Sequence, residues 1–378
     1  MMVKKPKIKK LKLKRAKEIV PEVVAEKAAN LNPLNRSDNS PANPDDVPKI
    51  TTENIGEHRE EVLKGARKYI YPLAHSKRRI IAVTVTVIIT AILALLVYCS
   101  LALYKFYQYN TFVYRVTQVV PFPIARAGGH FVDYENYLFE LRHYVHYYEQ
   151  QQQRDFAGAD HGQLIDFRRQ ALQNVINQAY VKQLAGQNHV SVSNKEVNQR
   201  LAEVRAQNRL GGNDKVFEDV LRSYWGWSIS DFKRSLKTEI LSEKVAAKLD
   251  TAATARAQEA LKQLKAGSDF ATLAKAVSED PSAKSNNGDY GGPFSKTNPN
   301  IPPEVINALF NMKVGQFSDV ILASPVLSNQ GPSLQIVKLT ATKDDTVSAQ
   351  HIVFNLQDIS TWIKPLQVQK PYHTYTHF

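Results

Sequence analysis

The sequence predicts a membrane-anchored protein in which a helical module precedes an α+β domain built on an antiparallel sheet. Residues 80–104 contain no charged side chain, as a membrane-spanning helix requires. Apolar residues recur at helical spacing between residues 164 and 184, and again between residues 229 and 245. Beyond residue 255 the pattern predicts helix, helix, strand, helix, strand and strand, an order that fits a compact α+β domain.

Length and composition limit the classes of protein that this chain can be. A chain of 378 residues suggests two or three modules, and 43% hydrophobic residues are enough for globular cores. The single cysteine, Cys99, excludes an internal disulfide. No group of cysteine and histidine residues has the spacing of metal ligands, so we expect no metal site and no cofactor.

Residues 77–107 are predicted to form the membrane segment. About 25 apolar residues in a helix span roughly 37 Å, more than the ~30 Å hydrocarbon core of a bilayer, which disfavours a buried globular helix. About 80 residues precede the segment, which disfavours a cleaved signal peptide. The basic residues 77–79 stand just before it. Because positive charge is retained in the cytoplasm, we expect a single pass through the cell membrane, with a cytoplasmic N-terminus and extracytoplasmic domains after the span.

Residues 1–76 are predicted to be a basic, largely disordered cytoplasmic tail. Residues 35–57 are rich in Asn, Asp, Ser and Pro, as linkers are. Lysine and arginine crowd residues 4–17, and the chain carries a formal net charge of +13. Such a cluster can bind nucleic acid or anionic lipid. Next to a membrane segment each basic residue contributes ~1 kcal/mol of attraction to the surface, so the lipid bilayer is the preferred partner and no nucleic acid is expected.

Residues 112–250 are predicted to form an all-α module of about five elements, entered through a short extended stretch at residues 116–124. Ser193 and Glu196 have the spacing of a capping box that opens a helix. The last segment, residues 357–378, shows no clear pattern. It is compatible with an extra strand, a helix or a disordered end.

The second module, residues 251–356, contains in order LKAGSDFATLAKAVSEDPSAK, GDYGGPF, IPPEVINALF and VGQFSDV. Over residues 255–354 this series resembles the parvulin-type peptidyl-prolyl isomerases. The helical module contains VINQAYVKQLAGQNHVSVSNKEVNQRL and DFKRSLKTEILSEKV. It resembles the chaperone domain of SurA- and PrsA-like extracytoplasmic foldases.

These resemblances imply a four-stranded antiparallel sheet with helices. They also imply a foldase that binds unfolded or nascent secreted polypeptides and catalyses cis/trans isomerisation of their X–Pro bonds. The alternative is a holdase chaperone that kept the parvulin shape with weak or no catalysis. A third class, envelope-structure or adhesion proteins, would need repeats or a wall-binding motif, and the sequence shows neither.

One strand of the parvulin pattern is out of place. Relatives begin with a strand of the type A-R-H-I-L-V, whose histidine belongs to the active site, whereas here residues 248–254 run directly into the first helix. The matching stretch, AQHIVF at residues 349–354, stands after the last strand. We expect a permuted order, in which the chain turns at residues 342–346 and places His351 in the vacant centre of the sheet. The alternative is a second, truncated parvulin copy, which would leave strand edges of the first copy exposed.

The resemblance also assigns the site residues. Asp280, in SEDPSAK, and His351 take polar catalytic positions, and Gln335 stands where relatives have a second histidine. Glutamine cannot titrate, so catalysis is expected to be weaker. The substrate-binding positions for the proline ring are Phe294, Ile301 and Val305. From the residues alone, Asp280 is better explained as a turn residue before a proline, and His351 as a core histidine; the resemblance reverses both interpretations.

Overall fold

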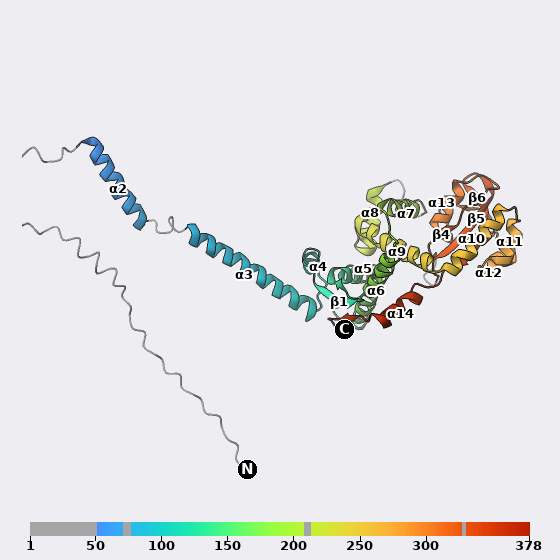
Figure 1. The fold of residues 1–378 in the computed structure, drawn as a ribbon, viewed down its shortest axis with the longest axis horizontal. Helices are drawn as coiled ribbons and strands as arrows, with labels where there is room; N and C mark the ends of the chain where they lie inside the picture. Colours follow the sequence, from blue (N-terminus) through green and yellow to red (C-terminus); the bar gives the residue numbers. More distant parts are fainter. Residues whose placement is uncertain (1–50, 71–76, 208–212, 327–329) are drawn as a thin grey trace, which may run out of the picture. The chain divides into compact units, whose positions relative to one another are not determined.

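The computed structural model describes residues 51–70, 77–207, 213–326 and 330–378 (Figure 1). By its internal contacts the chain divides into two compact units, residues 1–86 and 87–378. The basic cluster at residues 4–17 and most of the predicted linker lie outside the described residues.

The first unit contains helix α2 (Thr52–Ile70). It begins directly after Thr51, whose side-chain oxygen accepts a hydrogen bond from the backbone N–H of Asn54 at 3.4 Å. Glu53 lies in the first turn, where a negative charge interacts favourably with the helix dipole. The prediction of a disordered linker is therefore wrong for residues 52–57, which are helical.

Helix α3 (Lys77–Tyr104) contains the predicted membrane segment. Its residues 79–104 are long and apolar enough to cross a membrane, and the most apolar part of this stretch has no surface buried inside the protein. The end of α3 differs, because Cys99, Ala102 and Leu103 are buried in the core of the domain that follows. The buried Tyr134 hydroxyl donates a hydrogen bond to the Leu103 carbonyl at 2.7 Å. Packing as well as chain connectivity therefore joins the apolar helix to this domain.

The domain that follows is helical, as predicted. Its core lies between the long helices α5 and α6, and capping boxes at Ser193 and at Ser228 open two of the later helices. The helices are α4 (Thr111–Thr117), α5 (Tyr134–Gln152), α6 (His161–Gln187), α7 (Asn194–Gln207), α8 (Asp214–Trp225) and α9 (Ile229–Leu249).

The helical domain also contains a small sheet that the sequence did not predict. Strands β1 (Pro123–Ala127), β2 (His130–Asp133) and β7 (His373–Thr374) lie in the order β2-β1-β7. The predicted extended stretch at residues 116–124 is correct only toward its end, since α4 continues to Thr117.

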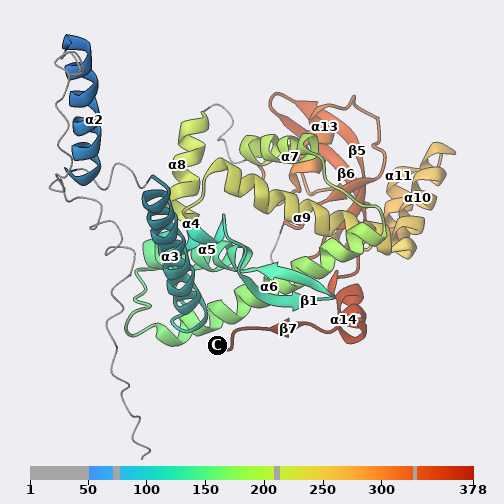
Figure 2. The same ribbon diagram turned by 60° about the vertical axis from the view of Figure 1, so that its left-hand side comes forward.

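The C-terminal segment supplies β7 and helix α14 (Ser360–Gln369), and it returns to the helical domain rather than to the second domain. Ile363 and Leu366 of α14 are buried in the same core as α5 and α6. Figure 2 shows β7 beside β1 and α14 against one end of α6. The Tyr180 hydroxyl holds the connection between them by donating to the Lys370 carbonyl at 2.6 Å.

The second domain is the predicted α+β domain with a four-stranded antiparallel sheet. Its sheet has the order β3-β6-β5-β4, so β6, the last of these strands in the chain, occupies a central position. The elements are α10 (Thr251–Lys265), α11 (Phe270–Val277), α12 (Pro281–Asn286), β3 (Phe294–Ser295), α13 (Pro303–Phe310), β4 (Ile321–Ala323), β5 (Ser333–Lys343) and β6 (Thr346–Asn355).

The hairpin formed by β5 and β6 produces this permuted order. The two strands pair along their whole length, with Val337 opposite His351, and Asp344 in the turn has a φ of 51°. Since β6 completes the sheet of the first copy, the alternative of a second, truncated copy is wrong. Helices α10 and α11 cover one face of the sheet, and α13 covers the other.

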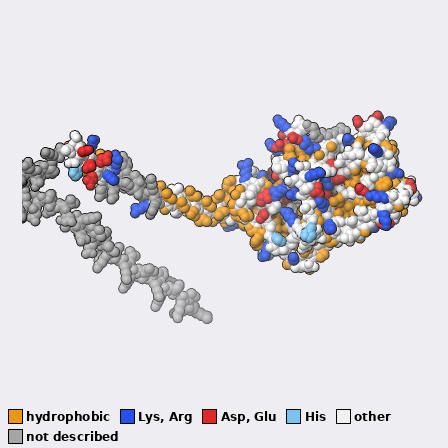
Figure 3. Space-filling view, turned by 45° about the horizontal axis from the view of Figure 1, so that its top comes forward, with side chains coloured by type: hydrophobic (Ala, Val, Ile, Leu, Met, Phe, Trp, Pro, Cys, Tyr) orange, Lys and Arg blue, Asp and Glu red, His pale blue; other side chains and the backbone are white. Residues whose placement is uncertain are grey.

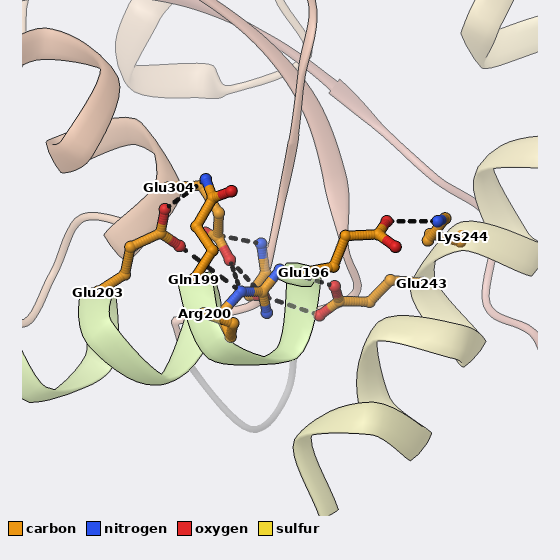
Figure 4. A network of polar contacts seen from close by, with 8 residues as sticks. Glu196, Gln199, Arg200, Glu203, Glu243, Lys244 and Glu304 are labelled. Carbon is orange, nitrogen blue, oxygen red and sulfur yellow. Dashed lines mark hydrogen bonds and ion pairs between the residues drawn. The ribbon is translucent and has the colours of Figure 1, made fainter. Parts of the chain in front are cut away.

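The helical domain and the α+β domain meet at a buried ionic network around Arg200 of α7 (Figure 4). Its guanidinium contacts Glu304 of α13 at 2.5 Å and Glu243 of α9 at 3.2 Å, and it donates to the Ser324 hydroxyl after β4. The Ser324 hydroxyl in turn donates to Glu243 at 2.7 Å. Burial, reinforced by the charge of Glu243, raises the pKa of the neighbouring Glu239 to about 7. Several carboxylates thus surround one buried cation.

Candidate functional site

The centre of the α+β sheet brings together a histidine and an aspartate that are 71 residues apart in the chain. His351 lies in β6 and is only 3% exposed. Asp280 is the N-cap of α12 and accepts a hydrogen bond from the backbone N–H of Ser282 at 2.9 Å. The segment before α12 is fixed to β6, because the Glu279 N–H donates to the Val353 carbonyl at 2.8 Å. His351 Nε2 and Asp280 Oδ2 are 2.7 Å apart as a result.

The electrostatics of this pair favour an ionised carboxylate. Burial alone would raise the pKa of Asp280, but hydrogen bonds from His351 and Ser282 outweigh it and hold the pKa below its usual value. An ionised carboxylate only accepts hydrogen bonds, so His351 donates from Nε2. Nδ1 of the same ring is buried and meets no hydrogen-bonding atom within the described parts of the chain. The imidazole therefore has one nitrogen fixed by Asp280 and one that is unpaired.

Tyr290 belongs to the same group, although the sequence did not single it out. Its ring stacks on the His351 ring, with centroids 4.1 Å apart and planes at 27°. Its hydroxyl donates to Gln335 Oε1 at 3.3 Å, and Gln335 Nε2 donates to the Ser333 hydroxyl at 3.0 Å. The motif GDYGGPF was the signal available in the sequence. A large aromatic side chain in a glycine-rich stretch beside a strand indicates a residue that packs against the protein, not one exposed in a turn.

These side chains line a hollow of about 450 Å³. Asp280, Gln335 and His351 all contribute to its wall, so the structure brings three of the predicted site residues to one place. Several prolines and polar residues complete the wall, among them Pro281, Pro302, Pro325, Pro332, Asn300 and Gln330.

The three predicted proline-pocket residues do not line this hollow. Phe294, Ile301 and Val305 are 6%, 3% and 0% exposed and belong to the apolar cluster between the sheet and α13. Val305 is completely enclosed by neighbouring apolar side chains. The role of these three residues in binding a proline ring stays a prediction.

Within the described residues, no group of three or more histidine, cysteine, aspartate or glutamate side chains is placed to hold a metal ion. The groups that line the hollow offer hydrogen bonds and the charge of Asp280.

The contact between Asp280 and His351 is expected to make stability depend on pH in the acid range. A lowered carboxylate pKa contributes stability above the ordinary value of 3.8, and that contribution is lost as the pH falls through the lower folded value. Asp280→Asn is therefore expected to destabilise the protein by about 1 kcal/mol near pH 7 and by less near pH 3. Urea unfolding of both proteins at the two pH values measures this difference. A constant difference would contradict it.

Comparison with known proteins identifies both domains. Residues 78–246 match the family model described as the SurA-like N-terminal domain, and residues 240–341 match the PPIC-type PPIASE domain. The chain therefore contains a SurA-like N-terminal domain followed by a PPIC-type, or parvulin, peptidyl-prolyl isomerase domain. The second match ends before β6, so the strand that carries His351 lies outside it.

Two proteins that are similar to this chain are named as foldases. The chain is 43% identical over 88 residues to the foldase protein PrsA of Halalkalibacterium halodurans, a match that covers 23% of each chain. This chain thus matches less than a quarter of the length of that curated relative. A crystal structure of the foldase protein PrsA from Streptococcus pneumoniae is 22% identical, covering 53% of this chain and 75% of that chain, with a TM-score of 0.17.

Proposed function

We propose that this protein is a membrane-anchored extracytoplasmic foldase, which binds unfolded secreted polypeptides and catalyses cis/trans isomerisation of their X–Pro bonds. The observation that carries the proposal is the contact between Asp280 and His351 in a hollow of the PPIC-type domain. Rotation about an X–Pro bond faces a barrier of ~18–20 kcal/mol because amide resonance must be broken. A site that binds the twisted amide more tightly than the planar one lowers this barrier without a bond to the substrate.

The hollow offers groups suited to that task. The twisted amide loses conjugation, so its carbonyl oxygen and its nitrogen interact differently with polar groups than in the planar state. His351 is oriented by Asp280, and the Gln335 amide is oriented by Tyr290 and Ser333. Fixed donors and acceptors of this kind cost no reorganisation when the bond twists.

A groove in the helical domain supports the chaperone part of the proposal. It has a volume of about 830 Å³ and is lined by α5, α6, α9 and the C-terminal segment. It shares Pro325, Gln330, Gly331 and Pro332 with the wall of the hollow. An extended polypeptide held in the groove would therefore have a neighbouring segment close to His351.

The surface of α3 supports the membrane anchor. Large apolar side chains along the helix are about half exposed, a pattern that is costly in water and usual in lipid (Figure 3). The basic residues before the span favour a cytoplasmic N-terminus, and this supports the extracytoplasmic location proposed for both folded domains.

The test is a protease-coupled prolyl isomerase assay on the full chain in detergent, since a protein that starts after Tyr104 would lack the buried end of α3. Replacing both Asp280 and His351 by alanine is expected to lower kcat/KM by roughly 100-fold, because losing one preorganised hydrogen-bond donor to a transition state costs at least about that much. Asp345→Ala, at the exposed tip of the hairpin, is the matched control and keeps the wild-type rate. Equal rates for the double variant and the control would remove the catalytic claim.

A non-catalytic holdase is the second candidate. It is favoured by Gln335 at the position of a second histidine and by the enclosed positions of Phe294, Ile301 and Val305. Suppression of aggregation of an unfolded protein, without any isomerase activity in the wild type, would identify this alternative.

A further inference from the structure

The backbone around Tyr290 is paired with β6, and this pairing fixes the position of the tyrosine. The His351 N–H donates to the Gly288 carbonyl at 2.8 Å, and the Tyr290 N–H donates to the Ala349 carbonyl at 3.2 Å. Gly288 has a φ of +82°, and a Cβ at this position would lie 2.8 Å from the His351 carbonyl oxygen. Only glycine permits this close approach, so residues 288–290 are held against β6 through an isolated β-bridge between Asp289 and Gln350.

The side chain of Tyr290 is then fixed on three sides. Its ring lies flat against His351, its hydroxyl donates to Gln335, and its ring meets Phe294 edge-on, with centroids 5.3 Å apart. Burial, with a contribution from the charge of Asp280, raises the pKa of the Tyr290 phenol. The hydroxyl therefore stays protonated and remains a donor at physiological pH.

Tyr290 also occupies a boundary between two environments. Among the described residues that line the hollow, it alone also packs in the apolar cluster that contains Phe294, Ile301 and Val305. His351 and Gln335 contact Tyr290 from the hollow, and Phe294 of the apolar cluster meets its ring edge-on.

We infer that Tyr290 is the specificity-determining residue of this site, because its ring closes the passage from the hollow into the apolar cluster. This inference rests on the proposed isomerase function. The substrate class it defines is an X–Pro segment whose proline ring is bound shallowly, against the mouth of the hollow, rather than deep between Phe294 and Val305. Peptide affinity is then low, and clients depend on the neighbouring groove for binding.

The ring and the hydroxyl of Tyr290 are expected to have different effects on binding and on catalysis. Tyr290→Leu removes the ring and opens the passage, so a proline-containing tetrapeptide is expected to bind roughly 10-fold more tightly, with a correspondingly lower KM. Tyr290→Phe keeps the ring and releases only Gln335, so KM stays at the wild-type value while kcat falls. This division between KM and kcat would not result from a general loss of structure.

The experiment uses the full chain in detergent with histidine-selective isotope labelling. Peptide binding is measured by titration, and the His351 ring signals show whether its contact with Asp280 survives in each variant. If Tyr290→Leu retains those signals and binds the peptide no more tightly than the wild type, the inference is overturned. If the leucine variant loses the signals, Tyr290→Val and Tyr290→Met provide the same opening with different packing, and unchanged affinity in the folded ones overturns it equally.

The binding measurement also separates this inference from the proposed function. A wild-type protein that shows no isomerase activity would remove the proposed function. The tighter peptide binding by Tyr290→Leu would still be observed if Tyr290 closes the passage.

Discussion

An Arg200→Met protein is expected to unfold with a free energy about 3–5 kcal/mol lower than that of the wild type. Arg200 and Glu243 are 8% and 4% exposed, and both lie at the junction of the two domains. Removing the guanidinium leaves Glu243 and Glu304 buried close together without a cation, and an unpaired buried charge costs more than the original pair contributed. Denaturant unfolding of the full chain in detergent measures the change.

The effect of Arg200→Met is also expected to depend on pH. Burial, despite the opposing charge of Arg200, raises the pKa of Glu243. Without Arg200 the same carboxylate takes up a proton more readily, which removes the unpaired charge. The loss of stability caused by Arg200→Met is therefore smaller near pH 5 than near pH 8. In this variant, the contact between the two domains is expected to be weakest in the alkaline range.

Arg222→Met is the matched control, because Arg222 forms an exposed pair with Glu218 at 2.8 Å on the surface of α8. Exposed pairs of this spacing contribute only ~0.3–0.5 kcal/mol. If Arg200→Met is no more destabilising than Arg222→Met, the network does not hold the junction together.

Deleting residues 358–378 is expected to destabilise the helical domain while the isomerase domain stays folded. The deletion removes Ile363 and Leu366 from the core between α5 and α6, and each buried aliphatic side chain of this size contributes about 2–5 kcal/mol. It also exposes the edge of β1, which β7 covers in the intact chain. Loss of protection from hydrogen exchange in β1 and α6, with protection retained in β5 and β6, is the expected result.

Point substitutions distinguish lost packing from general effects of truncation. Leu366→Ala is expected to reproduce part of the destabilisation, about 2–5 kcal/mol, whereas Val368→Ala should have little effect because Val368 is 84% exposed on the same helix. A truncated protein with the unfolding midpoint of the wild type would show that the C-terminal segment adds nothing to the domain.

Features that rest on local patterns could be predicted from the sequence. The helical periods of α6 and α9 and the capping box at Ser193 each lie within one element, so neighbouring residues contain the whole signal. The central position of His351 was predicted from the resemblance to parvulins, because the strand that begins their sheet is missing here and a matching one follows β5 after a short turn. The hairpin alone does not show that β6 is central, and it does not place His351 beside Asp280.

Features that rest on distant contacts could not be predicted. β7 has only two residues, and its partner β1 lies near the start of the helical domain, far away in the sequence. No local pattern therefore predicts this strand. Helix α14 contains Pro365, which ordinarily argues against a helix, and burial of Ile363 and Leu366 compensates for the lost hydrogen bond. The enclosed positions of Phe294 and Val305 depend on how Tyr290 packs, and a motif comparison does not reveal packing.

The permuted strand order has a consequence for the time at which the site is assembled. A chain made from its N-terminus presents Asp280 early, but the imidazole follows 71 residues later. Until β6 has been made, the position between β3 and β5 is not filled. The segment before α12 then lacks the strand to which it is hydrogen-bonded in the folded domain. During biosynthesis, the contact between Asp280 and His351 therefore forms only after the last strand of that domain has been made.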